Sequence, residues 1–312
     1  MAPCFLAEYR LAINANYITW RYALEFILLT LFRDIRGKMT SITIDEKKCL
    51  KDGICVAECP GRLLQMETSQ SCPTPTPDFE EYCLQCGHCV AVCPASALSL
   101  EWLGPDDCTP MARNLRVTPE QAEQFLTGRR SIRTYKDKTV AKPILEKLLE
   151  IAGAAPSAKN QQPWHWIVVQ EPHEVRRLAG MVIDWMRGVI EVSPEMAAER
   201  GLTRVVAAWD HGEERICRGA PHIIIAHGDK DWGFGSEDCA LAISLLDQYA
   251  TSLGLGCCWG GYFYSAVNAH RPLFEDLGLP DHHKAYGAVM LGYPKFRYRR
   301  IPLRNPPQVT WK

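Results

Sequence analysis

Residues 83–94 read Cys-Leu-Gln-Cys-Gly-His-Cys-Val-Ala-Val-Cys-Pro. The four Cys follow the spacing C-x2-C-x2-C-x3-C-P, which proteins use to hold [4Fe–4S] clusters. One tight loop brings three thiolates to a compact cube, Gly87 lets the loop fold closely, and Pro94 turns the chain away. A structural zinc site is the alternative, but zinc usually pairs two Cys with two distant ligands. We therefore expect an iron–sulfur site, with His88 as a polar neighbour rather than a ligand.

A second copy of this motif lies earlier in the chain. Residues 49–60 read Cys-Leu-Lys-Asp-Gly-Ile-Cys-Val-Ala-Glu-Cys-Pro, so Asp52 stands where the second Cys would be. Three interpretations stay open: Asp52 is a carboxylate ligand of a four-iron cluster, the cluster has three irons, or Cys72 supplies the missing ligand. Against the last, Cys72 falls in residues 69–77, whose three Pro indicate a linker.

Residues 41–103 as a whole resemble a two-cluster bacterial ferredoxin. In such proteins the fourth Cys of each run binds the other cluster. The resemblance therefore implies that each motif supplies its last Cys to the cluster of the other motif. One cluster would take Cys49, Cys55, Cys93 and, in the first interpretation, Asp52; the other would take Cys83, Cys86, Cys89 and Cys59.

Composition excludes several classes of protein. The 312 residues suffice for two domains, and 47% hydrophobic with 23% charged residues excludes a mainly disordered or fibrous chain. A net charge of −1 lacks the field that gathers nucleic acid or anionic membrane. The 14 Cys do not form a small secreted disulfide scaffold, so we expect thiols in a reducing compartment and a cytoplasmic protein.

The N-terminal segment contains the most apolar run, residues 17–32. Its 16 residues fall short of the roughly 20 that a membrane span needs, and they include Arg21 and Glu25. We therefore expect no membrane anchor. Two interpretations of residues 1–38 stay open. The segment is either an extension upstream of an alternative start at Met39 or an amphipathic helix lying on the domain.

Helices and strands alternate in the second half of the chain. Thr118-Pro-Glu-Gln121 predicts a capped helix start, and apolar spacing predicts a helix over 143–152. Strands are expected at 164–170, 221–226 and 284–291, with a helix at 236–253 that is apolar nearly all round and hence buried. The predicted fold class is α+β, with a ferredoxin-like domain followed by a three-layer α/β domain. The expected boundaries are 1–38 for the extension, 39–104 for the cluster domain, 105–117 for the linker and 118–312 for the second domain.

Three stretches of this second domain indicate ligand chemistry. Residues 129–133 (Arg-Arg-Ser-Ile-Arg) combine three cations with a hydroxyl and suit a phosphate, although such a run is often only a solvated face. Residues 155–164 place small and amide side chains before a strand, which suits a flat polar ligand or an ordinary turn. Residues 253–261 are Gly-rich but fail the dinucleotide fingerprint, because Trp259 holds the third Gly position.

In this order, and with Leu291-Gly-Tyr-Pro294 and a basic tail over 295–304, these stretches resemble the FMN-dependent nitroreductase family over about residues 120–312. The resemblance implies FMN at the interface of an intertwined homodimer. A nucleic-acid patch is the alternative for the tail, which its position after the last strand disfavours. The resemblance assigns the phosphate to Arg129, Ser131, Arg133 and Arg300, the ribityl chain and ring to Pro156, Ser157, Asn160 and Gln162, and close backbone approach to Gly260 and Gly261.

The leading functional hypothesis combines both halves of the chain. Electrons from an external donor, either ferredoxin-like or NAD(P)H, reach two iron–sulfur clusters, pass to FMN and leave to a small organic acceptor such as a nitro compound or a quinone. One alternative is an NAD(P)H-dependent nitroreductase with an accessory iron–sulfur domain. Another is an electron-transfer module without its own substrate. No nucleic-acid or membrane partner is expected, and no catalytic acid–base pair can be assigned.

Overall fold

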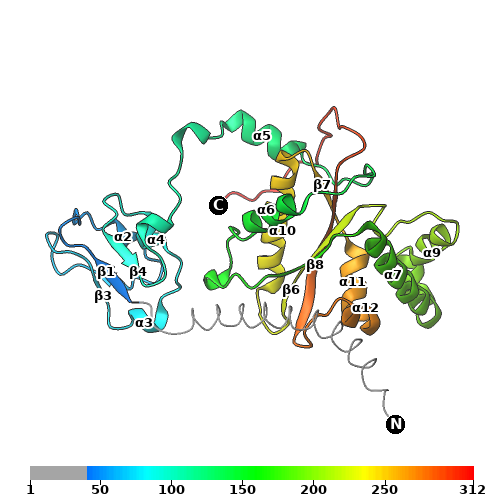
Figure 1. Ribbon diagram of the computed structural model, residues 1–312, viewed down its shortest axis with the longest axis horizontal. Coiled ribbons are helices and arrows are strands. Elements are labelled where there is room, and N and C mark those ends of the chain that lie inside the picture. Colours follow the sequence, from blue (N-terminus) through cyan, green and yellow to red (C-terminus); the bar gives the residue numbers. More distant parts are fainter. Residues whose placement is uncertain (1–40) are drawn as a thin grey trace, which may run out of the picture. The chain divides into compact units, whose positions relative to one another are not determined.

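The computed structural model describes residues 41–312, which fall into two compact units divided between Arg113 and Asn114 (Figure 1). We call residues 41–113 the cysteine unit and residues 114–312 the sheet unit. The apolar run 17–32 and the alternative start at Met39 lie outside the described residues. Within residues 41–312, no helix has both the length and the apolar character needed to cross a membrane.

The cysteine unit is built from short elements. Strand β1 (Ile42–Ile44) pairs antiparallel with β4 (Leu98–Leu100), and β2 (Leu64–Gln65) pairs antiparallel with β3 (Thr74–Pro75). Its core consists mainly of Leu63, Leu64, Phe79, Val90, Leu98 and Leu100. A core this small rarely stabilises a domain alone, so the unit is of the kind that needs a metal or another cross-link. Its helices are α2 (Ile54–Glu58), α3 (Phe79–Tyr82) and α4 (His88–Ala91), and 3₁₀ turns follow at Pro105–Asp107 and Arg113–Leu115.

The sheet unit is organised around a four-stranded antiparallel sheet in the order β5-β6-β8-β7. The central strand β6 is buried along residues 222–228, so both faces of the sheet are covered. Successive side chains of a strand point to opposite faces, and β6 follows this rule: Ile223 and Ile225 pack in one core, Ile224 and Ala226 in the other. The strands are β5 (His165–Val169), β6 (His222–Asp229), β7 (Gly256–Trp259) and β8 (His283–Gly292).

Helices cover both faces of this sheet, and the predicted three-layer arrangement is confirmed. Figure 1 shows α6 (Lys142–Ala152) and α10 (Gly235–Ser252) on one side, with α7 (Pro172–Val192) and α11 (Gly261–Ala269) on the other. Helix α5 (Pro119–Gly128) leads into the unit and buries none of its residues. The remaining helices, α8 (Pro194–Glu199), α9 (Leu202–Asp210) and α12 (Arg271–Asp276), pack with α7 and α11.

Most elements expected from the sequence are found within a residue or two of their predicted ends. The capping box also forms: Gln121 N–H donates to Thr118 Oγ1 at 3.2 Å, and Thr118 N–H donates to Gln121 Oε1 at 3.0 Å. One expectation is wrong in part, because α10 is not buried all round. Leu241 is 45% exposed, since it lies on a side of α10 that neither the sheet nor α6 covers.

Candidate functional site

The two Cys motifs fold as structural copies of each other. Lys51 (φ 58°) and Gly53 (φ 69°) adopt left-handed backbone in the first loop, and Gln85 (φ 51°) and Gly87 (φ 70°) do so at the matching positions of the second. The two Gly residues then begin α2 and α4. Asp52 therefore occupies in its loop the place that Cys86 occupies in the other.

The copies also match at their far ends. The Leu63 N–H donates to Cys59 Sγ at 3.3 Å, and the Ala97 N–H donates to Cys93 Sγ at 3.3 Å. Hydrogen bonds to cluster sulfurs are one of the means by which proteins adjust iron–sulfur sites. In each motif, a backbone N–H group thus donates a hydrogen bond to the sulfur of the last Cys.

The last Cys of each motif crosses to the other motif. One hollow is lined by Cys59 from the first motif together with the three Cys of the second loop. The other is lined by Cys93 from the second motif together with Cys49, Asp52 and Cys55. Both hollows are therefore shared between the motifs.

Three of the thiols around these hollows are partly shielded from water. Burial raises the pKa of Cys89 to about 12, and burial also raises the pKa of Cys55 and of Cys83 above the ordinary thiol value. A thiol of this kind keeps its proton at neutral pH unless a cation replaces it, so binding of iron would release protons.

Among residues 41–312, no group of three or more His, Cys, Asp or Glu side chains is arranged to hold a metal ion. A cubane cluster makes a different demand, since each of its thiolates bonds its own iron. Thiols spread around a hollow fit that demand better than thiols converging on one point. The residues present therefore fit a cluster more closely than a single zinc ion.

In the sheet unit, residues 129–135 run beside β7 and β8. The Ile132 N–H donates to the Cys257 carbonyl at 2.8 Å, and the Tyr135 hydroxyl donates to the Ile132 carbonyl at 2.7 Å. Gly256 is required here, because a side chain at that position would overlap Ile132. The predicted phosphate-binding stretch is thus held against the sheet by backbone contacts rather than by its own cations.

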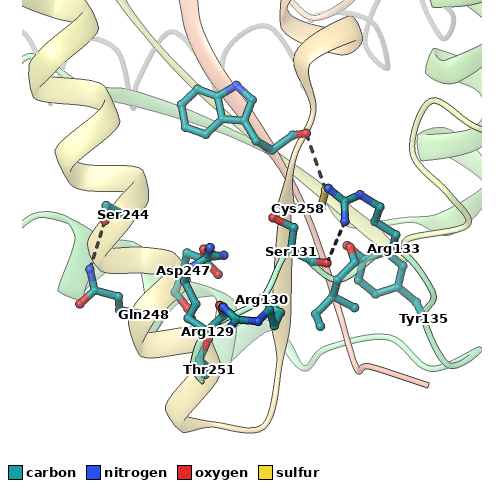
Figure 2. Close-up of polar contacts among 12 residues, drawn as sticks. Arg129, Arg130, Ser131, Arg133, Tyr135, Ser244, Asp247, Gln248, Thr251 and Cys258 are labelled. Carbon is teal, nitrogen blue, oxygen red and sulfur yellow. Dashed lines mark hydrogen bonds and ion pairs between the residues drawn. The ribbon is translucent and has the colours of Figure 1, made fainter. Parts of the chain in front are cut away.

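The three Arg of this stretch differ in availability (Figure 2). Arg129 Nη1 lies 3.1 Å from Asp247 Oδ2 of α10, and Arg130 Nη1 donates to the Arg129 carbonyl at 2.6 Å. Arg133 lies away from α10, is exposed, and reaches only the Ser131 carbonyl at 3.5 Å. Of the three, Arg133 is the least committed to the protein itself.

The polar loop before β5 has an unusual backbone. Lys159 (φ 53°), Asn160 (φ 54°) and Gln162 (φ 47°) all adopt left-handed conformations, which non-glycine residues rarely do. Within the loop, the Gln162 N–H donates to Ser157 Oγ at 2.9 Å. Strain of this kind is tolerated where the surrounding structure fixes the chain, and it concentrates at ligand sites.

Asp238 of α10 holds this loop in place, and its role could not be predicted, because it lies inside a predicted helix where no motif marks it. Its Oδ1 accepts from the Ala158 N–H at 2.9 Å, and its Oδ2 accepts from Trp232 Nε1 at 2.8 Å. The carboxylate is buried, with only 3% of the residue exposed. Asp238 is therefore a positioning residue for the loop over 157–162.

The other predicted FMN residues differ in how exposed they are. Gly260 is buried and its N–H donates to the Ala288 carbonyl at 2.7 Å, whereas Gly261 is exposed and a side chain added there would meet nothing within 4 Å. Pro156 is exposed at the start of the polar loop. Arg300 lies in the exposed tail, and within residues 41–312 no hydrogen bond or ion pair joins it to residues 129–133.

Comparison with known proteins defines the class of the sheet unit. The sequence family described as the nitroreductase family matches residues 126–293. An FMN-bound nitroreductase structure from Bacteroides fragilis is 25% identical, with a TM-score of 0.51, over 62% of this chain and 99% of its own. A Methanothermobacter thermautotrophicus protein with the provisional name NADH dehydrogenase/NAD(P)H nitroreductase is 31% identical over 57% of this chain and 80% of its own. An FMN reductase [NAD(P)H] of Bacillus subtilis is 27% identical over 57% and 67%.

The layered antiparallel sheet and the polar loops at its edge are thus those of a flavin-type α/β domain. The chain belongs to the nitroreductase family.

Proposed function

We propose that this chain is an iron–sulfur flavoprotein that passes electrons from two clusters in the cysteine unit to FMN in the sheet unit. A small organic acceptor, such as a nitro compound or a quinone, then receives them. The enzyme class rests on the family itself: the chain is an FMN-dependent oxidoreductase. What the proposal adds is the path by which electrons enter.

The crossing of the two motifs carries this proposal. Cys59 lines the hollow of the second motif and Cys93 lines that of the first, which is the exchange that two-cluster ferredoxins use. Two separate zinc sites or a structural Cys cluster would not require it. The same crossing supports a cluster domain over residues 39–104, joined through a linker over 105–117 to the flavin domain over 118–312. The proposed ligands are Cys83, Cys86, Cys89 and Cys59 for one cluster, and Cys49, Cys55, Cys93 and a fourth donor, Asp52 or Cys72, for the other.

Within the sheet unit, the polar stretches are proposed to hold FMN. When bound, FMN stores two electrons and can deliver them as a hydride. Arg133 and Ser131 would bind the phosphate, and Arg129 would join them if it exchanged its Asp247 partner. The strained loop would present its amides and hydroxyl to the ribityl chain and ring, and Gly261 leaves open space for a flat ring to approach. The assigned set is Arg129, Ser131, Arg133, Pro156, Ser157, Asn160, Gln162, Gly260, Gly261 and Arg300.

A second copy of this chain is the proposed partner, in a homodimer. Leu303 is 99% exposed and Trp311 90% exposed in the tail that follows β8. Large apolar side chains left uncovered mark protein–protein contacts, and a homodimer would cover them. The 13 Cys of residues 41–312 are all free thiols, which supports action in the reducing cytoplasm.

A second candidate is an NAD(P)H-dependent reductase whose clusters are not on the electron path. The names of the relatives from M. thermautotrophicus and B. subtilis favour it. The two candidates differ in which donor reduces the flavin quickly. Rapid flavin reduction by NADH or NADPH alone would favour the second candidate.

The proposal is tested by anaerobic reconstitution of the full chain with iron, sulfide and FMN. We expect one FMN and two iron–sulfur clusters per chain, measured by iron and acid-labile sulfide analysis and by electron paramagnetic resonance (EPR) of the dithionite-reduced protein. The control is Cys108→Ser, because Cys108 lies outside both hollows. Reconstituted protein that carries FMN but no iron would contradict the proposal, whereas Cys86→Ser should lower the iron content without lowering the FMN content.

A further inference from the structure

The first cluster site has four donors around its hollow and a further thiol, that of Cys72, next to a residue that lines it. Its hollow is lined by Cys49, Cys55, Cys93 and Asp52, and also by Pro73, the neighbour of Cys72. The hairpin formed by β2 and β3 brings this segment back onto the first motif, where Met66 Sδ lies in contact range of Gly53. The Pro-rich residues that the sequence indicated as a linker therefore lie against the first cluster site.

A folded turn precedes Cys72, which itself directly precedes the hollow-lining Pro73. Ser71 Oγ donates to the Thr68 carbonyl at 2.9 Å, and the Thr68 N–H donates to Ser71 Oγ at 3.1 Å. Pro73 directly after the turn fixes the backbone and is buried. Held between these two constraints, Cys72 is half-buried, and burial together with the neighbouring Cys49 thiol raises its pKa.

The Asp52 carboxylate already has a structural task. Its Oδ1 accepts from the Ile54 N–H at 3.1 Å, at the beginning of α2. A carboxylate in this position stabilises a helix start by satisfying a free N–H group. Asp52 is also exposed, while Cys72 is half-buried. A carboxylate held in this way is a poorer candidate for iron than a nearby thiol, since cluster iron prefers soft sulfur ligands.

The first motif lacks a loop thiol that the second motif has, but it has a further thiol nearby. The second motif has a Cys at position 86 and four Cys around its hollow. The first motif has Asp52 at the matching place, and it alone has an additional thiol, supplied by the hairpin that connects the motifs. The loss of one thiol from the loop therefore coincides with the gain of another from outside it.

We propose that Cys72 is the fourth protein ligand of the first iron–sulfur cluster, and that Asp52 instead accepts the hydrogen bond of the Ile54 N–H at the start of α2. This inference rests on the proposed two-cluster function. On binding, the Cys72 thiol releases its proton to solvent and bonds iron as a thiolate, with no change in the oxidation state of sulfur. Rotation about the Cα–Cβ bonds parts the Cys49 and Cys72 sulfurs so that each bonds its own iron.

The test compares Cys72→Ser and Asp52→Asn in the full, anaerobically reconstituted chain, with Cys108→Ser as the matched thiol control. Asn keeps a side-chain oxygen for the Ile54 N–H but removes the carboxylate. We expect Asp52→Asn to retain two four-iron clusters. We expect Cys72→Ser to lose about one iron per chain and to show the EPR signal of a three-iron cluster after mild oxidation. FMN content and the signal of the second cluster report, in the same samples, that each variant is folded.

The reverse pattern, with a three-iron signal in Asp52→Asn and none in Cys72→Ser, would make Asp52 the ligand and overturn the inference. Equal behaviour of the two variants, whether both keep or both lose the fourth iron, overturns it as well. Wild-type protein that contains no first cluster would instead show that the proposed function itself fails. The iron content of the wild type thus separates the two failures.

Discussion

Arg133 illustrates how single residues differ within one motif. Arg129 and Arg130 are engaged with Asp247 and with a backbone carbonyl, whereas Arg133 is exposed and weakly bonded. Burial raises the pKa of Asp247, and the nearby Arg129 guanidinium opposes that rise, so this pair stabilises itself rather than a ligand. In the proposed FMN site, Arg133 is therefore the Arg most available to bind the phosphate.

We predict that Arg133→Ala weakens FMN binding on the order of tenfold or more, because a charge-assisted contact contributes about 1.5–3 kcal/mol. Equilibrium dialysis or fluorescence titration of FMN measures the change. Arg204→Ala is the control, since Arg204 is an exposed cation of α9 with no assigned role. Unchanged affinity in Arg133→Ala would show that the phosphate is bound elsewhere.

A second prediction concerns a group of buried imidazoles at one end of the sheet. His227 Nδ1 lies 2.9 Å from His283 Nδ1, and the His165 ring lies beside both. Burial, reinforced by the neighbouring rings, lowers the pKa of His227 to about 3 from its ordinary 6.5. The unfolded chain therefore takes up a proton below pH 6.5 that the folded chain refuses, so stability is complete above pH 6.5 and is lost as the pH falls toward 3.

For this one group, the free energy of unfolding should fall by about 2 kcal/mol between pH 7 and pH 5. We expect His227→Gln to show a correspondingly smaller loss, measured by urea unfolding at both pH values. His173→Gln serves as the control because the His173 side chain is 75% exposed. An identical pH dependence in His227→Gln and wild type would argue against a neutral buried His227.

At the scale of elements, two glycines differ in the space around them. Gly188 lies within α7, and a side chain added there meets nothing within 4 Å, so Gly188→Ala should stabilise the protein by about 0.5–1 kcal/mol. Gly235 begins α10, and a side chain there would overlap the Tyr286 ring, so Gly235→Ala should destabilise by about 1–3 kcal/mol. Thermal unfolding measures both, and shifts of the same sign would contradict the packing described.

Local patterns predicted many of these elements because their causes are local. The capping box at Thr118, the apolar spacing of α6 and the continuous apolar run of β6 each act within a few residues. Pairings over longer distances could not be predicted in this way. Arg129 meets Asp247 across 118 positions, Ala158 meets Asp238 across 80, and the hairpin that brings Cys72 to Cys49 depends on two-residue strands.

The same distinction applies to the candidate site. The arrangement of the Cys within each loop could be predicted from their spacing, because the left-handed turns and short helices depend only on the local motif. The role of Asp238 was missed, since a lone Asp in a helix carries no pattern. The predicted burial of α10 all round was wrong because composition does not tell which side of a helix faces the sheet.

At the scale of the whole molecule, the cysteine unit and the sheet unit are separate compact bodies on one chain. The proposed linker over residues 105–117 joins them, and a tether of this kind raises the effective concentration of one redox site at the other. Covalent linkage of this kind has a clear use if the clusters feed the flavin. It has little use if a dissolved nicotinamide reduces FMN directly.

The proposed electron path is tested most directly by stopped-flow flavin reduction in the double variant Cys86→Ser/Cys89→Ser, which removes two proposed ligands of one cluster. Cys108→Ser is the control. FMN content should equal that of the wild type. We predict that FMN reduction by a reduced low-potential ferredoxin falls to the background rate, while a small chemical donor acting on FMN itself still reduces the flavin. Wild-type rates with both donors in the double variant would contradict the account, because they would show that electrons reach FMN without the clusters.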